Sequence, residues 1–334
     1  MAKIRRLNYF DKPKLKKLIA FLKTNNHNHF LEMIKTSFLG YLHNFLPLKY
    51  KFLDESYLMT EKNQALGLIT VNTFNGNHEK INISQLLFLE NAYEVAQQLI
   101  EYIVSQYGGL GANTFYVLID DMYNELAQLF INNCGFRQCS CEQIWEVSKR
   151  SFKKNKTIKY RRFRKADVKE VADIYNDSVL SHFRPTLIRS EKEFHETLCS
   201  GLKYLTEYRY VIEDNSTSHI IAYFKISTAD DTNYTVDFNY SNGYNIDFDT
   251  ILYFATREIL KRKRRFKLFI KSKNYINTNN AQKEYFENSG FKCRNTKLLL
   301  TKDFFKPVKE YAAENNFSLV GGLNNSPTFK ISEN

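Results

Sequence analysis

Features that would assign the chain to several common classes are scarce or missing. No apolar run approaches the ~18 residues that a membrane span needs. The first residues, MAKIRRLNYF, are positively charged but lack the apolar stretch of a signal peptide, so we expect a cytoplasmic protein with no membrane contact. The five cysteines are an odd count without metal-like spacing to the seven histidines. This favours reduced thiols over disulfides and predicts no metal site.

The composition is that of a folded protein with more than one core. Apolar residues make up 43% of the chain and aromatic residues 15%, which is enough to bury cores and unlike a disordered protein. The length of 334 residues exceeds the ~250 to 300 residues at which a single core usually stops growing. We therefore expect two domains.

Positive charge is concentrated in the second half of the chain. The net charge is +12; Lys and Arg outnumber Asp and Glu by 16 to 14 up to Arg150 and by 32 to 22 after it. Nine of the later cations lie between Arg257 and Lys273. They are either the solvated last turn of a helix, whose dipole favours cations, or a surface for a phosphate-rich partner such as a nucleotide or RNA.

Two phrases of the sequence recur at nearly the same offset. KIRRLNYFD (3–11) resembles KYRRFRKAD (159–167), and AQLFINNCGF (127–136) resembles QKEYFENSGF (282–291). A repeat of this length indicates two similar domains and not a solenoid, whose repeats run about 20 to 50 residues. We predict an N-terminal domain over 1–150, a linker over 151–156, a second domain over 157–305 and an extension over 306–334.

Both units show the same order of periodic patterns. Each begins with a strand and two helices, the second of which is expected over 30–42 and over 191–202. Three strand-like runs follow, then a helix, a strand, a helix and a closing hairpin that starts at Gly-Phe. The predicted fold class is α+β: a mixed, mostly antiparallel sheet flanked by helices and present twice.

This order resembles the GCN5-related N-acetyltransferase (GNAT) superfamily in both halves of the chain. The resemblance includes the pattern Asn-x-x-Ala-x-x-x-Tyr-x-x-x-Gly-Phe on the last helix. The matching positions are Asn124, Ala127, Ile131, Gly135 and Phe136 in the first copy and Asn279, Gln282, Phe286, Gly290 and Phe291 in the second.

The resemblance implies an acetyl-CoA site where two parallel strands separate. The family's Gln/Arg-x-x-Gly-x-Gly/Ala turn holds the pyrophosphate on backbone N–H groups, and glycine gives the phosphate room. The aligned residues are Asn91, Glu94 and Ala96 in the first copy and Ile246, Asp249 and Ile251 in the second. Glu94 and Asp249 would bring negative charge toward a pyrophosphate in both copies. The first copy is the better candidate, because Asn91 and Ala92 at the start of its helix leave room for a phosphate. The expected cofactor-binding residues are Asn91, Ala92, Ala96, Asn124 and Asn279.

The resemblance also implies a tyrosine that protonates the CoA thiolate and a base for the amine. Ile131 and Phe286 occupy the tyrosine's positions, and Tyr285 lies one residue early, turned by ~100° around the helix. Asp237 lies on the expected central strand of the second copy, on the face opposite Val236. We take Tyr285 and Asp237 as the candidate catalytic residues.

Three functions fit the sequence. The first is an acyl-CoA-dependent N-acyltransferase that acetylates a small-molecule or peptide amine, with at least one domain inactive. The second is a non-catalytic pair of GNAT-like domains acting as a binding or scaffold protein. The third, suggested by the missing pyrophosphate turn and the basic second half, is an aminoacyl-tRNA-dependent transferase.

Overall fold

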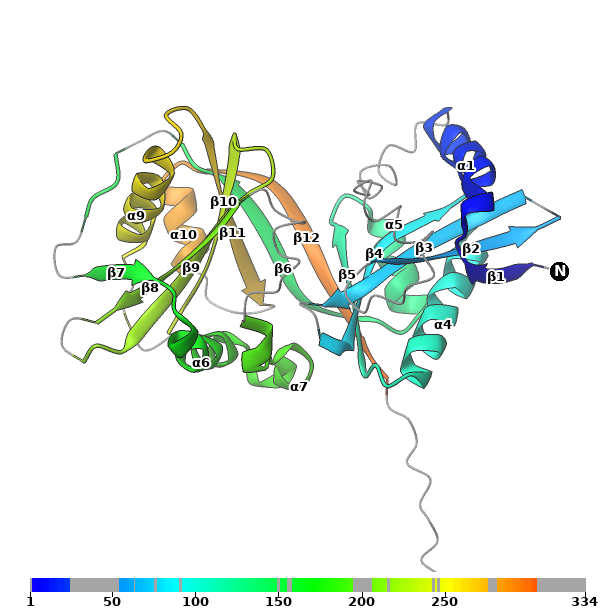
Figure 1. The fold of residues 1–334 in the computed structure, drawn as a ribbon, viewed down its shortest axis with the longest axis horizontal. Helices are drawn as coiled ribbons and strands as arrows, with labels where there is room; N and C mark the ends of the chain where they lie inside the picture. Colours follow the sequence, from blue (N-terminus) through cyan, green and yellow to red (C-terminus); the bar gives the residue numbers. More distant parts are fainter. Residues whose placement is uncertain are drawn as a thin grey trace, which may run out of the picture.

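The strands of the protein form one continuous sheet. The computed structural model describes residues 2–24, 54–62, 64–74, 77–89, 92–148, 151–154, 158–194, 206–214, 217–241, 244, 247–275 and 281–304. Its 12 strands follow the order β1-β2-β3-β4-β5-β12-β6-β11-β10-β9-β8-β7 (Figure 1). The β4–β5 and β10–β11 pairs are parallel and the others antiparallel, as the predicted mixed sheet requires.

The N-terminal half contains the expected order of elements. They are β1 (Lys3–Arg6), α1 (Lys12–Thr24), β2 (Glu55–Glu61), β3 (Gln64–Phe74), β4 (Asn77–Phe88), α4 (Tyr93–Gly109), β5 (Thr114–Asp120), α5 (Asn124–Gln128), a π-helical turn (Leu129–Asn133) and β6 (Arg137–Glu146). The helix predicted over 30–42 lies outside the described residues.

The C-terminal half repeats this order. Its elements are β7 (Lys159–Arg162), α6 (Val168–Ser178), α7 (Arg184–Leu187), the 3-10 helix η5 (Glu191–Phe194), β8 (Thr206–Glu213), β9 (Ile220–Thr228), β10 (Asn233–Tyr240), α9 (Phe248–Leu260), β11 (Lys267–Tyr275), α10 (Ala281–Asn288) and β12 (Lys292–Asp303). The helix predicted over 191–202 begins as η5, and the rest of it lies outside the described residues.

The two halves exchange their last strands. β12 lies between β5 and β6, so the last strand of the C-terminal half completes the N-terminal sheet, and β6 correspondingly pairs with β11. The predicted closing hairpins are therefore wrong. Each segment is one long strand, of 10 residues in β6 and 12 in β12, because each pairs along its length with strands on both sides instead of turning back on itself.

Each core consequently contains residues of the other half. Leu300 of β12 is completely buried among N-terminal side chains, and Trp145 of β6 is 3% exposed within the C-terminal core. A third cluster packs α6 and α7 against Tyr116 of β5 and Leu299 of β12. Figure 1 shows α9 and α4 on opposite sides of the twisted sheet at its two ends, as expected for two copies related by a rotation.

The first repeated phrase forms an Arg–Asp latch between strand and helix in both halves. Arg5 donates two hydrogen bonds to Asp11 at 2.6 and 2.5 Å, and Arg161 donates two to Asp167 at 2.7 and 2.9 Å. The two carboxylates are 1% and 6% exposed. Burial alone would raise the pKa of each carboxyl, but the arginine and a backbone N–H outweigh burial and hold both pKa values below the ordinary range.

The second repeated phrase ends a helix and returns the chain to the core. Gly135 and Gly290 have φ of 69° and 71°, the left-handed conformation that glycine adopts without strain. The phenylalanine after each glycine packs back on its helix: Phe136 lies 5.0 Å from Phe130, and Phe291 lies 5.7 Å from Phe286, between ring centroids. The repeat therefore reflects a shared helix-to-strand junction.

We expect Leu300→Ala to destabilise the whole protein. The variant leaves a cavity in the N-terminal core, so the free energy of unfolding should fall by about 2 to 5 kcal/mol. Urea unfolding followed by circular dichroism measures it, with Leu260→Ala, a leucine 51% exposed, as the control. A loss no greater than that of the control would contradict the exchange of β12.

We expect Asp11→Asn to lower the free energy of unfolding at pH 7 by about 1.5 to 3 kcal/mol, the range for hydrogen bonds to charged groups. Because the folded pKa of Asp11 is lowered, the latch contributes its stability above the ordinary value of 3.8 and loses it as the pH falls through the folded pKa. Wild type and variant should thus converge in acid. A difference that persists there would show that the charge of Asp11 is not its source.

Candidate functional site

The sheet opens at the same place in each half. β4 and β5 pair as far as Ile83 and Val117, although β4 runs on to Phe88. β10 and β11 pair as far as Asp237 and Lys271 before they diverge. Parallel strands that separate leave backbone groups along both edges free to bind a ligand.

A β-bulge marks the opening in the N-terminal half. Thr70 of β3 faces Gln85 and Val71 faces Ile83, so Ser84 is an extra residue in β4. Ser84 Oγ donates to the Thr70 carbonyl at 3.2 Å. The N–H of the extra residue in a bulge makes no hydrogen bond to the paired strand. Here the extra residue, Ser84, directly follows the last β4–β5 pair, Ile83 and Val117. The register of β9 with β10 has no such shift.

A row of buried, neutral polar side chains crosses the strands beside the bulge. Ser56 Oγ and Thr70 Oγ1 lie 2.9 Å apart, and Thr70 Oγ1 donates to Gln85 Oε1 at 3.0 Å. All three residues are 5% exposed or less. Buried hydroxyl and amide groups held in this way are fixed in orientation and can position a polar ligand.

Helix α4 begins at the end of this opening without a side-chain cap. The N-cap residue is Ala92, whose side chain offers no hydrogen-bond acceptor. Its carbonyl accepts from the N–H groups of Val95 and Ala96, and no side chain caps the N–H groups that precede them, which suits an anion. Glu94 lies exposed in the first turn. Tyr93 donates to Glu125 of α5 at 2.5 Å, which ties the starts of the two helices together.

Carboxylates occupy the corresponding start of α9. Asp247 caps the helix by accepting from the Asp249 N–H at 3.0 Å and from Thr250 Oγ1 at 2.8 Å. Tyr285, a predicted catalytic residue, donates its hydroxyl to Asp249. Its ring packs against Phe248, with centroids 5.2 Å apart. This end of the helix is thus filled by the protein's own groups and is negative.

Asp237, the other predicted catalytic residue, lies among half-buried positive charges. Its Oδ1 is buried and has no hydrogen-bond partner among the described residues. Burial alone would raise the pKa of Asp237, but the positive charges of Lys273, Lys271, Lys225 and Arg189 outweigh burial and hold the pKa below its ordinary value. A carboxylate with a lowered pKa is a weak proton acceptor.

The remaining predicted cofactor residues differ in their surroundings. Asn91 and Asn279 lie outside the described residues. Ala96 is completely buried on the inner face of α4, so it lets the helix lie close to the sheet but cannot touch a phosphate. Asn124 is exposed at the start of α5. Ala92 is the predicted residue whose position at the helix start suits an anion.

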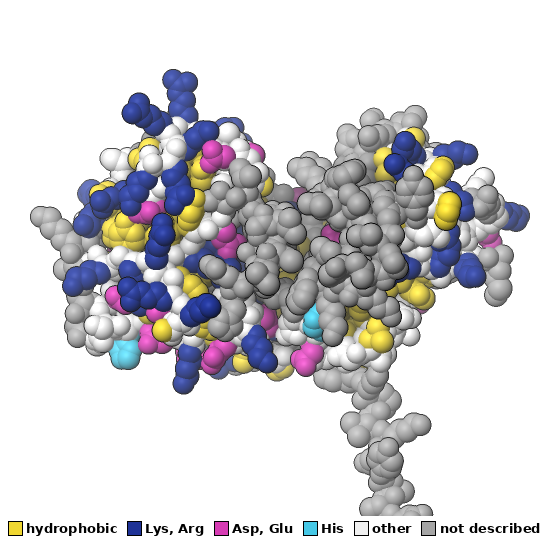
Figure 2. Space-filling view, in the orientation of Figure 1, with side chains coloured by type: hydrophobic (Ala, Val, Ile, Leu, Met, Phe, Trp, Pro, Cys, Tyr) yellow, Lys and Arg dark blue, Asp and Glu magenta, His cyan; other side chains and the backbone are white. Residues whose placement is uncertain are grey.

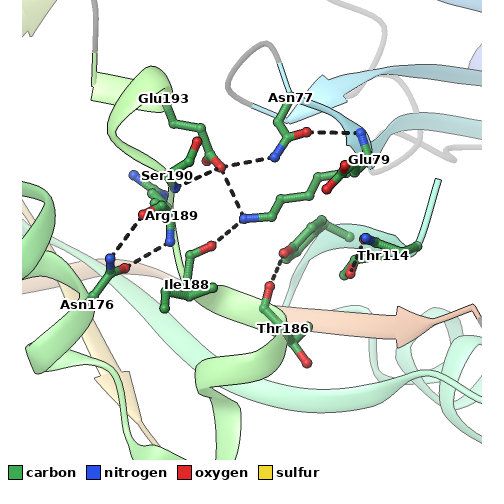
Figure 3. A network of polar contacts seen from close by, with 12 residues as sticks. Asn77, Glu79, Thr114, Asn176, Thr186, Ile188, Arg189, Ser190 and Glu193 are labelled. Atoms are coloured by element: carbon green, nitrogen blue, oxygen red, sulfur yellow. Dashed lines mark hydrogen bonds and ion pairs between the residues drawn. The ribbon is translucent and has the colours of Figure 1, made fainter. Parts of the chain in front are cut away.

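A network of polar contacts between the halves was not foreseen from the sequence. Lys80 of β4 binds Glu193 of η5 at 3.1 Å and also donates to the Ile188 carbonyl. Figure 3 shows Asn77 turned toward the same carboxylate, which it reaches at 3.2 Å. The buried Arg189 guanidinium stacks 4.2 Å from the Tyr175 ring centroid. Sequence patterns report periodicity within an element, so contacts between distant elements leave no signal there.

Within the described residues, no helix is long and apolar enough to cross a membrane. No three side chains of His, Cys, Asp or Glu in these ranges gather as a metal site requires.

We expect Asp237→Asn to act on stability. The substitution removes the negative charge at the centre of several half-buried cations, so the free energy of unfolding should fall by about 0.5 to 3 kcal/mol. Chemical denaturation at pH 7 tests this, with the exposed Asp173→Asn on α6 as the control. Full stability together with lost activity would instead support the predicted catalytic role.

Comparison with known proteins identifies the fold. By sequence, the chain matches no protein-family model and no curated protein. By structure, it is similar to a GCN5-related N-acetyltransferase from Sphaerobacter thermophilus, with a TM-score of 0.60 and 11% identity over 90% of this chain and 95% of that one. It is also similar to a tandem GNAT protein of the clavulanic acid biosynthesis pathway, with a TM-score of 0.55 and 8% identity over 91% and 98%.

The likeness extends over both halves, and one of the similar structures is itself a tandem protein. Together with the doubled order of elements and the opening between parallel strands, it shows that the chain has the fold of the GCN5-related N-acetyltransferases in two copies.

Proposed function

We propose that the protein is an acyl-CoA-dependent N-acyltransferase whose cofactor binds in the N-terminal half. The supporting observation is that the N-termini of α4 and α9, the corresponding helices of the two halves, differ. Ala92 leaves the start of α4 uncapped, whereas Asp247 and Asp249 fill the start of α9. The strand opening is present in both halves, but the bulge at Ser84 is a feature of the first.

The residues of the N-terminal half fit an acyl-CoA. The free N–H groups of α4 bind a pyrophosphate, and the small side chain of Ala92 lets it approach the backbone. The edges of β4 and β5 beyond Ile83 bind an extended arm through backbone hydrogen bonds. Acetyl-CoA, when bound, supplies the acyl group as a thioester. The N–H at the bulge is placed to stabilise negative charge on the carbonyl oxygen.

The amine acceptor, a small molecule or a peptide, binds beside the buried row of Ser56, Thr70 and Gln85. These side chains are neutral, so they orient the amine and leave its proton to solvent. Asp237 cannot serve as the base for this opening. The sheet order places β10 five strand spacings from β4, which is about 24 Å at ~4.8 Å per spacing.

The residues of the C-terminal half fit the second function for that half, a GNAT-like domain that does not catalyse acyl transfer. Phe286, at the position of the family's tyrosine, is completely buried, and the hydroxyl of Tyr285 is held by Asp249. We propose that this half is structural with respect to catalysis. Transfer from aminoacyl-tRNA makes a different prediction: binding would fall steeply with salt, because phosphate contacts release counterions.

Titration calorimetry of the full-length protein with acetyl-CoA tests the proposal. We expect Ala92→Asp to weaken binding by about tenfold or more, since the new carboxylate caps α4 and competes with the pyrophosphate. Glu94→Gln should strengthen binding by about two- to fivefold, because a nearby negative charge is removed.

Asp247→Ala and Asp249→Asn are the matched controls in the other half and should leave the affinity unchanged. A changed affinity in these controls, with Ala92→Asp unaffected, would place the cofactor in the C-terminal half. The absence of saturable binding by the wild type at millimolar acetyl-CoA would sink the proposal.

A further inference from the structure

A cavity opens at the end of the C-terminal sheet away from the strand opening. Its volume is about 840 Å³, within the range of sites for small ligands. The walls come from the end of α9, the start of β11, the end of β6 and the start of β12. The parallel pair β10–β11 diverges at the opposite end of β11, so this cavity is separate from the acyl-CoA site of the fold.

The cavity is strongly basic. Arg264, Arg265, Lys267, Lys292 and Arg294 line it, against a single acid, Glu146. Arg294 donates to Glu146 at 2.5 Å, so that pair is neutral. Among the described residues, the other four cations make no ion pair. Four uncompensated cations around one hollow create a positive potential that favours a polyanion. Figure 2 shows Lys and Arg side chains crowding the lobe that holds α9.

The cavity also has apolar walls. Phe152 and Phe266 line it, together with Val147 and Leu268. The hydroxyl of Thr256, also in the lining, is buried and has no hydrogen-bond partner among the described residues. Planar side chains beside cations suit a ligand that carries both an aromatic ring and phosphate.

A second hollow adjoins the first. Its volume is about 390 Å³, and it shares Arg265, Phe266 and Lys267 with the larger cavity. The segment from Arg265 to Lys267 therefore projects between two hollows and presents its cations to both.

The N-terminal half provides an internal comparison, because its corresponding corner is closed. There the end of β12 pairs with the start of β5, and Phe304, next after β12, lies over Gly108 of α4. A Cβ on that glycine would lie 2.5 Å from the Phe304 ring. The segment that joins α4 to β5, Leu110 to Asn113, contains no cation, whereas the segment from Lys261 to Phe266 after α9 contains five. The basic cavity is thus a feature of one copy and not of the fold.

We infer that this cavity binds a phosphorylated ligand with an aromatic ring, such as a nucleotide. The cations bind the phosphates, Phe152 and Phe266 contact the ring, and Thr256 supplies a hydroxyl. The same chemistry is offered by a free nucleotide and by the phosphorylated end of an RNA strand. The inference does not depend on acyl transfer, since it uses different residues at the other end of the sheet.

Titration calorimetry of the full-length protein with ADP, pyrophosphate and adenosine tests the inference. We expect saturable binding of ADP, weaker binding of pyrophosphate, which lacks the ring, and none of adenosine. The double variant Arg264→Glu/Arg265→Glu should weaken ADP binding by at least about tenfold. Lys292→Glu, on a different element, should weaken it as well. Acetyl-CoA binding to the N-terminal half should persist in the double variant.

The matched control is Lys16→Glu/Lys17→Glu, the same charge change on exposed residues of α1. An equal loss in the control would overturn the inference, because the effect would then be one of net charge. So would ADP binding that the cavity variants leave unchanged, tight binding of adenosine, or no binding of ADP.

A 5′-phosphorylated single-stranded RNA hexamer, compared with its 5′-hydroxyl form, separates the two sources. Tighter binding of the phosphorylated RNA than of ADP, lost in the double variant, identifies an RNA end. Binding of ADP without preference for the phosphorylated RNA identifies a free nucleotide.

Discussion

The exchange of β6 and β12 sets the condition under which both halves fold. Each core is completed by a strand from the other half, with Leu300 buried in the first and Trp145 in the second. Unfolding one half would therefore remove a wall of the other's core, which couples their stabilities. A copy linked in this way can lose its chemistry, but it cannot lose its fold without cost to its neighbour.

This coupling explains which residues the two copies have in common and which differ. The Arg–Asp latches at Asp11 and Asp167, and the left-handed glycines 135 and 290, perform the same structural task twice. The starts of α4 and α9 do not: one lacks a cap and the other carries Asp247 and Asp249. The two copies agree where the fold needs the residue and differ where a ligand would bind.

The sequence allowed the order of elements and the fold class to be predicted, because periodicity and turn residues act locally. The partners of β6 and β12 could not be predicted in this way. Both strands face equivalent edges, β5 or β11, and an alternating pattern suits either partner.

Single side chains were harder to place than elements. The sequence places Tyr285 one residue away from the position of the family's tyrosine, and its hydroxyl donates to Asp249 of α9. The bulge at Ser84 left no signal in the sequence, because Leu86, Leu87 and Phe88 are all buried and the alternation of β4 is lost at that point.

The division of the molecule also explains how a basic cavity could arise in one copy. The cations Arg264 and Arg265, between α9 and β11, and Lys267, the first residue of β11, are exposed and take no part in the Arg–Asp latch. Charged side chains there are exposed to solvent and destabilise the fold little, so residues at these positions can change to suit a ligand. In the N-terminal half the same corner is held by Phe304 against Gly108, which leaves no room for such a change. The two copies thus leave two different openings at the ends of one sheet, one between separating strands and the other at a corner that the first copy fills with Phe304.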